Sequence, residues 1–100
     1  MRKKKKISSI ILLIIVVLSL TSCSTKETLL FLNWGEYIDE ELISQFEKEY
    51  NCTVVMDLAD SNELFYSKVS AGTTVYDVVC PSDYMVIKMY KKGLLSEIDF

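Results

Sequence analysis

The amino-acid sequence predicts an α/β fold in which three parallel strands alternate with three helices. Short apolar runs of strand length are separated by segments whose apolar residues recur with helical periodicity. Helix-ending signals also follow the second and third helical segments, at Gly72 and Gly93. Strands that alternate with helices of this length imply right-handed crossovers, and therefore a parallel sheet.

The first strand is expected at residues 28–32, a continuous apolar run typical of a strand that is buried on both faces. Residues 39–50 predict the helix that follows, because acidic residues at its start complement the helix dipole. Its apolar stripe comprises Ile38, Leu42, Ile43 and Phe46.

The second strand is expected at residues 52–58, where apolar side chains alternate. A capping-box pattern from Asp60 to Glu63 then predicts the start of a helix that runs to Gly72. Capping accounts for Asn62 and Glu63 without a ligand.

The third strand is expected at residues 75–80. Pro81 and Ser82 end it, and residues 83–92 form the last predicted helix.

The N-terminus predicts an export signal. A basic segment at residues 2–6 precedes an apolar run at residues 7–20, which is shorter than the 18 or more apolar residues that a spanning helix usually needs. A permanent membrane helix is the less favoured alternative. The tetrad Leu20-Thr21-Ser22-Cys23 resembles the lipobox of bacterial lipoproteins, which implies that signal peptidase II removes residues 1–22 and that Cys23 carries a lipid. Residues 23–27 would then be a lipidated Cys and a short tether, anchored to the outer face of the cytoplasmic membrane or in the periplasm.

Charge changes markedly once the signal is removed. Five of the 11 basic residues lie in the signal and all 14 acidic residues follow it, so the mature chain of 78 residues would carry a net charge of −8. Such a chain is poorly suited to nucleic acid and suits a cationic solute, although acidity that serves only solubility is equally compatible.

The remaining cysteines, Cys52 and Cys80, are expected to be unpaired and buried, because both lie in strand-like apolar segments. The sequence has no His and no C-x-x-C pair, so it predicts neither a metal site nor a cofactor.

Candidate binding residues follow the first and third strands, because ligands bind at the carboxyl ends of strands in open parallel sheets. If these strands are neighbours, one crevice would contain Trp34, Glu36, Tyr37, Ser82 and Tyr84. Aromatic faces attract an ammonium group, and a carboxylate adds a charge-assisted hydrogen bond. Alternatives stay open, since Trp34, Tyr37 and Tyr84 could be packing residues and Ser82 could be only a helix cap.

Four segments resemble the polyamine-binding proteins of bacterial spermidine/putrescine ABC importers. They are Leu30-Phe31-Leu32-Asn33-Trp34-Gly35-Glu36-Tyr37-Ile38, Asp60-Ser61-Asn62-Glu63-Leu64, Tyr76-Asp77-Val78-Val79-Cys80-Pro81-Ser82-Asp83-Tyr84 and the helix end at residues 88–99. The resemblance implies a type II periplasmic-binding-protein-like receptor that passes an extended polyamine to a membrane permease. It also implies that Trp34, Tyr37 and Tyr84 form aromatic walls, that Glu36 faces an amine and that Ser82 adds a polar contact.

Two residues and the length depart from that family. Gly35 stands where some members carry Thr, and Cys80 where many carry Val. Residues 28–100 correspond to only the first half of one lobe, so the chain is expected to be a fragment or a truncated product that does not bind polyamine tightly alone.

Other functions remain open. The chain could bind another small cation or a different solute, or be a truncated or structural lipoprotein that binds none. An exported enzyme is disfavoured, because no Ser or Cys has an evident base.

Overall fold

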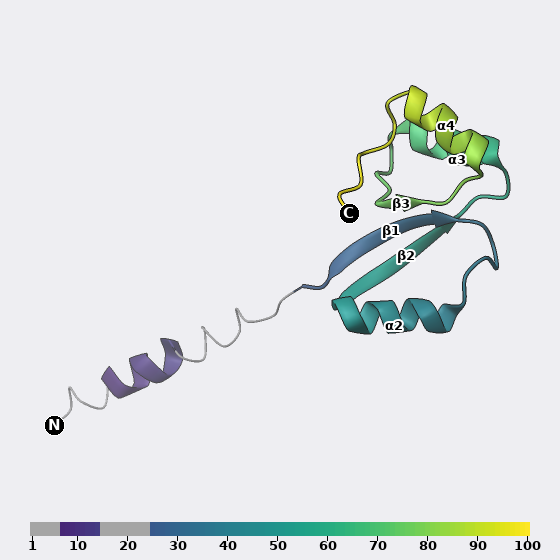
Figure 1. The fold of residues 1–100 in the computed structure, drawn as a ribbon. Coiled ribbons are helices and arrows are strands. Elements are labelled where there is room, and N and C mark those ends of the chain that lie inside the picture. Colours follow the sequence, from purple (N-terminus) through teal and green to yellow (C-terminus); the bar gives the residue numbers. More distant parts are fainter. Residues whose placement is uncertain (1–6, 15–24) are drawn as a thin grey trace.

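The computed structural model describes residues 7–14 and 25–100 (Figure 1). Residues 7–14 form a helix within the predicted signal, whereas the lipobox and Cys23 lie outside the described residues. Among the helices of the described ranges, none combines the length and apolarity needed to cross a membrane. The remaining elements, in chain order, are β1 (Glu27–Asn33), α2 (Glu40–Tyr50), β2 (Cys52–Leu58), α3 (Asn62–Ala71), β3 (Val78–Val79) and α4 (Asp83–Lys91).

The three strands form a parallel sheet with the order β2-β1-β3, which confirms the predicted α/β class. β1 pairs with β2 along its whole length, from Glu27 opposite Cys52 to Asn33 opposite Leu58. Its other edge pairs with β3. The continuous apolar run of β1 suits this central place, because a central strand of a covered sheet is buried on both faces.

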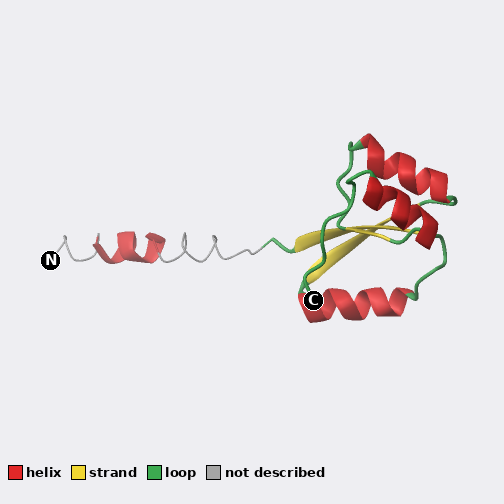
Figure 2. Ribbon diagram, turned by 45° about the horizontal axis from the view of Figure 1, so that its top comes forward, coloured by secondary structure: helices red, strands yellow, loops and turns green. Residues whose placement is uncertain are grey.

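The helices cover the sheet unequally. α3 and α4 lie together on one face, and α2 lies on the other (Figures 1 and 2). The core lies between the sheet and the α3/α4 pair, and its buried members are Leu32, Ala59, Phe65, Met85 and Met89. Since burying a side chain such as Phe65 contributes about 1.5 to 3 kcal/mol, this cluster is the main source of packing energy.

α2 is well capped but poorly covered. Asp39 caps it by accepting a hydrogen bond from the Glu41 amide at 2.9 Å, and Asn51 ends it in a left-handed conformation. The expected apolar stripe is only partly covered, since no residue of α2 is fully buried and Leu42 is 55% exposed. α2 packs against β2, which is an edge strand of the sheet, so part of the stripe has no strand beneath it.

The start of α3 differs from the expectation. Ser61, not Asp60, is the cap, and its hydroxyl oxygen accepts a hydrogen bond from the Leu64 amide at 3.1 Å. Glu63 is therefore the second helical residue, one position short of the third place that a capping box requires. The predicted end of α3 is confirmed by Gly72, whose φ of 68° is the left-handed conformation that glycine favours.

β3 is much shorter than the predicted strand at residues 75–80. The Asp77 carboxylate accepts a hydrogen bond from the Leu30 amide at 2.7 Å, where a regular ladder would use a backbone carbonyl. The Asp77 amide still donates to the Leu30 carbonyl at 2.9 Å. The Asp77 carboxylate thus takes the place of a backbone acceptor, and regular strand pairing is confined to Val78 and Val79.

Candidate functional site

The exits of all three strands lie at one edge of the sheet, since the strands are parallel and β1 is central. β1 and β3 are neighbours, which was the condition for their exit turns to converge. Trp34 follows β1, Asp60 follows β2 and Ser82 follows β3. This edge is where open parallel sheets bind ligands.

Trp34 joins two of these turns. Its indole Nε1 donates a hydrogen bond to the Cys80 carbonyl oxygen at 2.9 Å. Its ring also lies 4.9 Å from the Phe65 ring, at an interplanar angle of 49°. Trp34 is half-buried and packs against the core, so it is in part a packing residue. The exposed part of its side chain remains accessible to a ligand.

Glu36 and Tyr37 are presented to solvent by the same turn. Glu36 has a φ of 54°, a left-handed conformation that is uncommon for a residue with a side chain and recurs at functional turns. It makes no ion pair with any other residue that the structure describes. Tyr37 is 69% exposed, so core packing does not explain it.

The turn after β3 presents Ser82 and Tyr84. Ser82 stands at the cap position of α4, yet its hydroxyl makes no capping hydrogen bond. Instead, the Asn62 Nδ2 donates to the Ser82 Oγ at 3.1 Å, and the Ser82 amide donates to the Asn62 Oδ1 at 2.9 Å. Tyr84 is 53% exposed at the start of α4 and, like Tyr37, is not a core residue.

A shallow hollow of about 500 Å³ lies between the exits of β1 and β2. Its lining comprises Trp34, Gly35, Leu58, Ala59, Asp60 and Leu64. Asp60 is exposed here and does not cap α3, so it is a second carboxylate beside Trp34 that the sequence reasoning assigned to capping. The signal that could have found it is its place directly after a strand, which it shares with the other turns.

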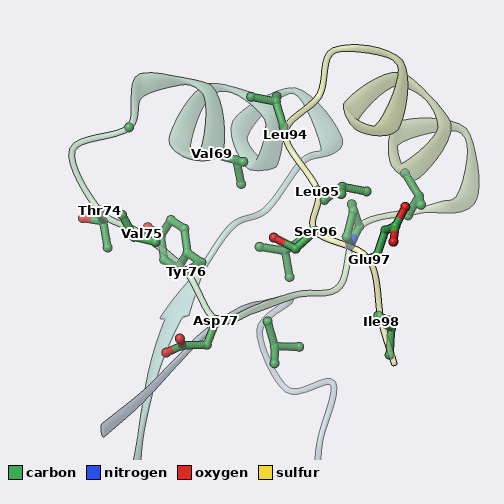
Figure 3. A pocket seen from close by; sticks show the side chains of 15 residues that line it. Val69, Thr74, Val75, Tyr76, Asp77, Leu94, Leu95, Ser96, Glu97 and Ile98 are labelled. Atoms are coloured by element: carbon green, nitrogen blue, oxygen red, sulfur yellow. The ribbon is translucent and has the colours of Figure 1, made fainter. Parts of the chain in front are cut away.

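A larger cavity of about 650 Å³ lies elsewhere, along β3 and the C-terminal segment (Figure 3). Figure 3 shows Val69, Leu94 and Leu95 among its apolar lining residues. None of the five predicted ligand residues lines this cavity, and its two carboxylates, Asp77 and Glu97, stand among mostly apolar side chains.

A polar network stiffens the approach to β3. The Asp57 carboxylate accepts hydrogen bonds from the Tyr76 hydroxyl and from the Lys68 ammonium, the latter at 2.9 Å. The Tyr76 hydrogen bond, followed by that of Lys68, holds the pKa of Asp57 below its ordinary value. The same contact raises the pKa of Tyr76, because its proton is shared with a carboxylate. The network ties β2 and α3 to the segment before β3, outside the candidate site.

Cys52 and Cys80 are free, and Cys52 is buried as expected, whereas Cys80 is only half-buried. Within residues 7–14 and 25–100, no three His, Cys, Asp or Glu side chains are grouped so that they could hold a metal ion.

The parallel sheet with aromatic and acidic exit turns defines the class as part of a type II periplasmic-binding-protein lobe. The structure of a spermidine/putrescine ABC transporter substrate-binding protein from Streptococcus pneumoniae superposes with a TM-score of 0.72 at 43% identity, over 74% of this chain and 23% of that one. The chain belongs to the hypothetical lipoprotein family (MG045 family), whose model matches residues 1–100.

Curated relatives of known sequence are binding proteins of the same kind as this structural neighbour. The spermidine/putrescine-binding periplasmic protein of Salmonella typhimurium is 40% identical over 83 residues, which are 82% of this chain and 24% of the relative. The putrescine-binding periplasmic protein PotF of Escherichia coli is 35% identical over 79 residues, which are 79% of this chain and 21% of the relative. The chain thus spans about a quarter of the length of these relatives, which are binding proteins rather than enzymes.

Proposed function

We propose that this chain contributes one wall of a polyamine site in the extracytoplasmic solute-binding component of an ABC importer. The printed names of the relatives support the ligand class, spermidine or putrescine. The observation that carries the proposal is the hydrogen bond from Trp34 to the Cys80 carbonyl, because it joins the two turns that hold all five predicted ligand residues.

The proposed roles follow from the chemistry of a polyamine, which alternates apolar methylene segments with ammonium groups. Trp34, Tyr37 and Tyr84 would flank the methylene groups, which gain free energy when they leave water. Glu36 would face an ammonium group, which needs a charged partner once its hydration is lost. Ser82 would add a polar contact through its hydroxyl oxygen.

The proposal extends to the organisation of the chain. Residues 1–22 would be a lipoprotein signal peptide, residues 23–27 a lipidated Cys23 and tether, and residues 28–100 the first part of lobe I. Durable anchoring needs two acyl chains or an equivalent second signal, which a lipoprotein Cys supplies. The ligand would pass from the anchored protein to the membrane permease of the importer.

A chimaera tests the proposed site. Residues 28–100 would replace the matching segment of the Streptococcus pneumoniae protein, which supplies the rest of the receptor and serves unaltered as the positive control. Isothermal titration with spermidine and putrescine should give saturable binding, and Trp34→Ala should weaken it by about 2 kcal/mol, or roughly 30-fold.

Matched variants separate the site from general surface effects. Glu36→Gln should weaken binding less than Trp34→Ala, since other acids would share the charge. Tyr90→Ala, which removes an aromatic that is 74% exposed outside the site, should leave the affinity unchanged. Unchanged affinity in Trp34→Ala would contradict the proposed cage, and preference for an uncharged solute would reassign the ligand.

A further inference from the structure

Asn62 makes two hydrogen bonds to one residue that is 20 positions away. Its Oδ1 accepts from the Ser82 amide at 2.9 Å, and its Nδ2 donates to the Ser82 hydroxyl oxygen at 3.1 Å. We propose that Asn62 is a positioning residue for the polyamine site, which holds the turn after β3 in place and orients the Ser82 hydroxyl. This inference rests on the proposed function and adds a residue to it that need not touch the ligand.

The orientation of the Asn62 amide follows from its partners. A backbone N–H can only donate, so the oxygen of Asn62 must face the Ser82 amide, and the Nδ2 must therefore face the Ser82 hydroxyl. The hydroxyl oxygen accepts one hydrogen bond from Asn62 and keeps one lone pair. An ammonium group has only donors, so this lone pair is the feature of Ser82 that it can use.

The position of the contact makes it a link across the sheet edge. β1 lies between β2 and β3, so these two strands are about 10 Å apart, twice the spacing of neighbouring strands. The hydrogen bonds between Asn62 and Ser82 therefore bridge the end of β1, beside Trp34. Together with the bond from Trp34 to Cys80, they tie all three exit turns to one another.

Helix capping does not explain Asn62. Ser61 caps α3 through its own hydroxyl, and Asn62 is the first residue of the helix. Asn62 is half-buried, and both hydrogen bonds that the structure gives its side chain go to Ser82. An asparagine that serves only local helix structure would bond to its own turn.

The first test needs no ligand and uses the full chain. Hydrogen exchange at the Ser82 amide, measured at single-residue resolution, should accelerate roughly tenfold in Asn62→Ala, because the amide loses its acceptor. Asn62→Asp should restore protection, since a carboxylate oxygen can accept the same bond. Glu63→Ala, an exposed neighbour in the same turn, should leave the exchange unchanged. If the Ser82 amide exchanges at the wild-type rate in Asn62→Ala, or if Asn62→Asp does not restore its protection, Asn62 does not position the turn.

The second test uses the chimaera described above. Asn62→Ala should weaken spermidine binding by roughly five- to tenfold, and its effect should shrink when Ser82→Ala is already present, because both variants remove the hydrogen bond from the Asn62 Nδ2 to the Ser82 hydroxyl. Independent, multiplying effects would refute the orientation of the Ser82 hydroxyl by Asn62. If the unaltered chimaera does not bind polyamine, the proposed function fails, and with it the role of Asn62 in polyamine binding. Exchange at Ser82 still decides separately whether Asn62 positions the turn.

Discussion

Replacing Trp34 by Phe isolates the hydrogen bond that joins the turns after β1 and β3. A phenyl ring can keep the contact with Phe65, at a present centroid distance of 4.9 Å, but it has no donor for the Cys80 carbonyl. The net loss of a hydrogen bond is about 1 kcal/mol, and the part-buried carbonyl left without its partner raises the expected cost to about 1 to 2 kcal/mol. Trp34→Ala removes the ring contact as well. Full truncation of a buried aromatic costs about 3 to 5 kcal/mol, so a half-buried ring should lose about 2 to 3 kcal/mol.

Urea unfolding measures these differences. Trp34 is the single tryptophan of the chain, so the transition should be followed by far-ultraviolet circular dichroism rather than by fluorescence. The free energy of unfolding should fall from wild type to Trp34→Phe to Trp34→Ala, while Tyr90→Phe serves as an exposed control. A Trp34→Phe value within about 0.3 kcal/mol of wild type would show that the indole hydrogen bond does not hold the turns together.

Three further predictions concern the anchor, the polar network and the isolated chain. Cys23→Ala should abolish palmitate incorporation, and equal labelling of variant and wild type would refute the lipid assignment. Because the native pKa of Asp57 is lowered, its network should stabilise the fold above about pH 4 and lose that contribution as the pH falls through the native value. The raised pKa of Tyr76 likewise predicts a contribution to stability that is present below about pH 10 and is lost at higher pH. In Asp57→Asn, the free energy of unfolding should therefore depend less on pH in both the acidic and the alkaline range. The mature chain alone should not bind spermidine tightly, because an ion pair at an exposed turn contributes only about 0 to 1 kcal/mol; saturable micromolar binding by a folded monomer would contradict this.

The parts of the fold that the sequence predicted depend on local patterns. The apolar run of β1 and the alternation of β2 mark strands whatever their neighbours are, and the structure places both within two residues of the expected bounds. Helix ends were equally local, since Gly72 needs only its own backbone conformation to end α3. The grouping of Trp34 with Ser82 needed one more inference, that β1 and β3 are neighbours, and the strand order confirms it.

Apart from the cap of α3, which lies one residue later than expected, the errors arose where a side chain has a partner far along the sequence. Asp77 was expected to be an ordinary strand residue. Instead, its carboxylate accepts a hydrogen bond from the amide of Leu30, 47 positions earlier, and β3 is shorter than expected. Asn62 was explained by capping, because its partnership with Ser82 exists only once the three strands are in order. Residue patterns encode local conformation, whereas such contacts depend on the packed fold.

The candidate site divides into a part held by hydrogen bonds and a part exposed to solvent, and this division bears on how affinity could arise. Trp34 and Ser82 are held by hydrogen bonds to other turns, so a ligand would meet them already ordered. Glu36, Tyr37 and Tyr84 are exposed, and each would lose side-chain freedom on binding at a cost of about 0.5 to 1.5 kcal/mol. That cost is comparable to the free energy that a solvated ion pair contributes. These three side chains would therefore add net binding free energy only when a facing surface excludes water. The fixed pair would set the position of a polyamine, and the opposing surface would determine how tightly it is held.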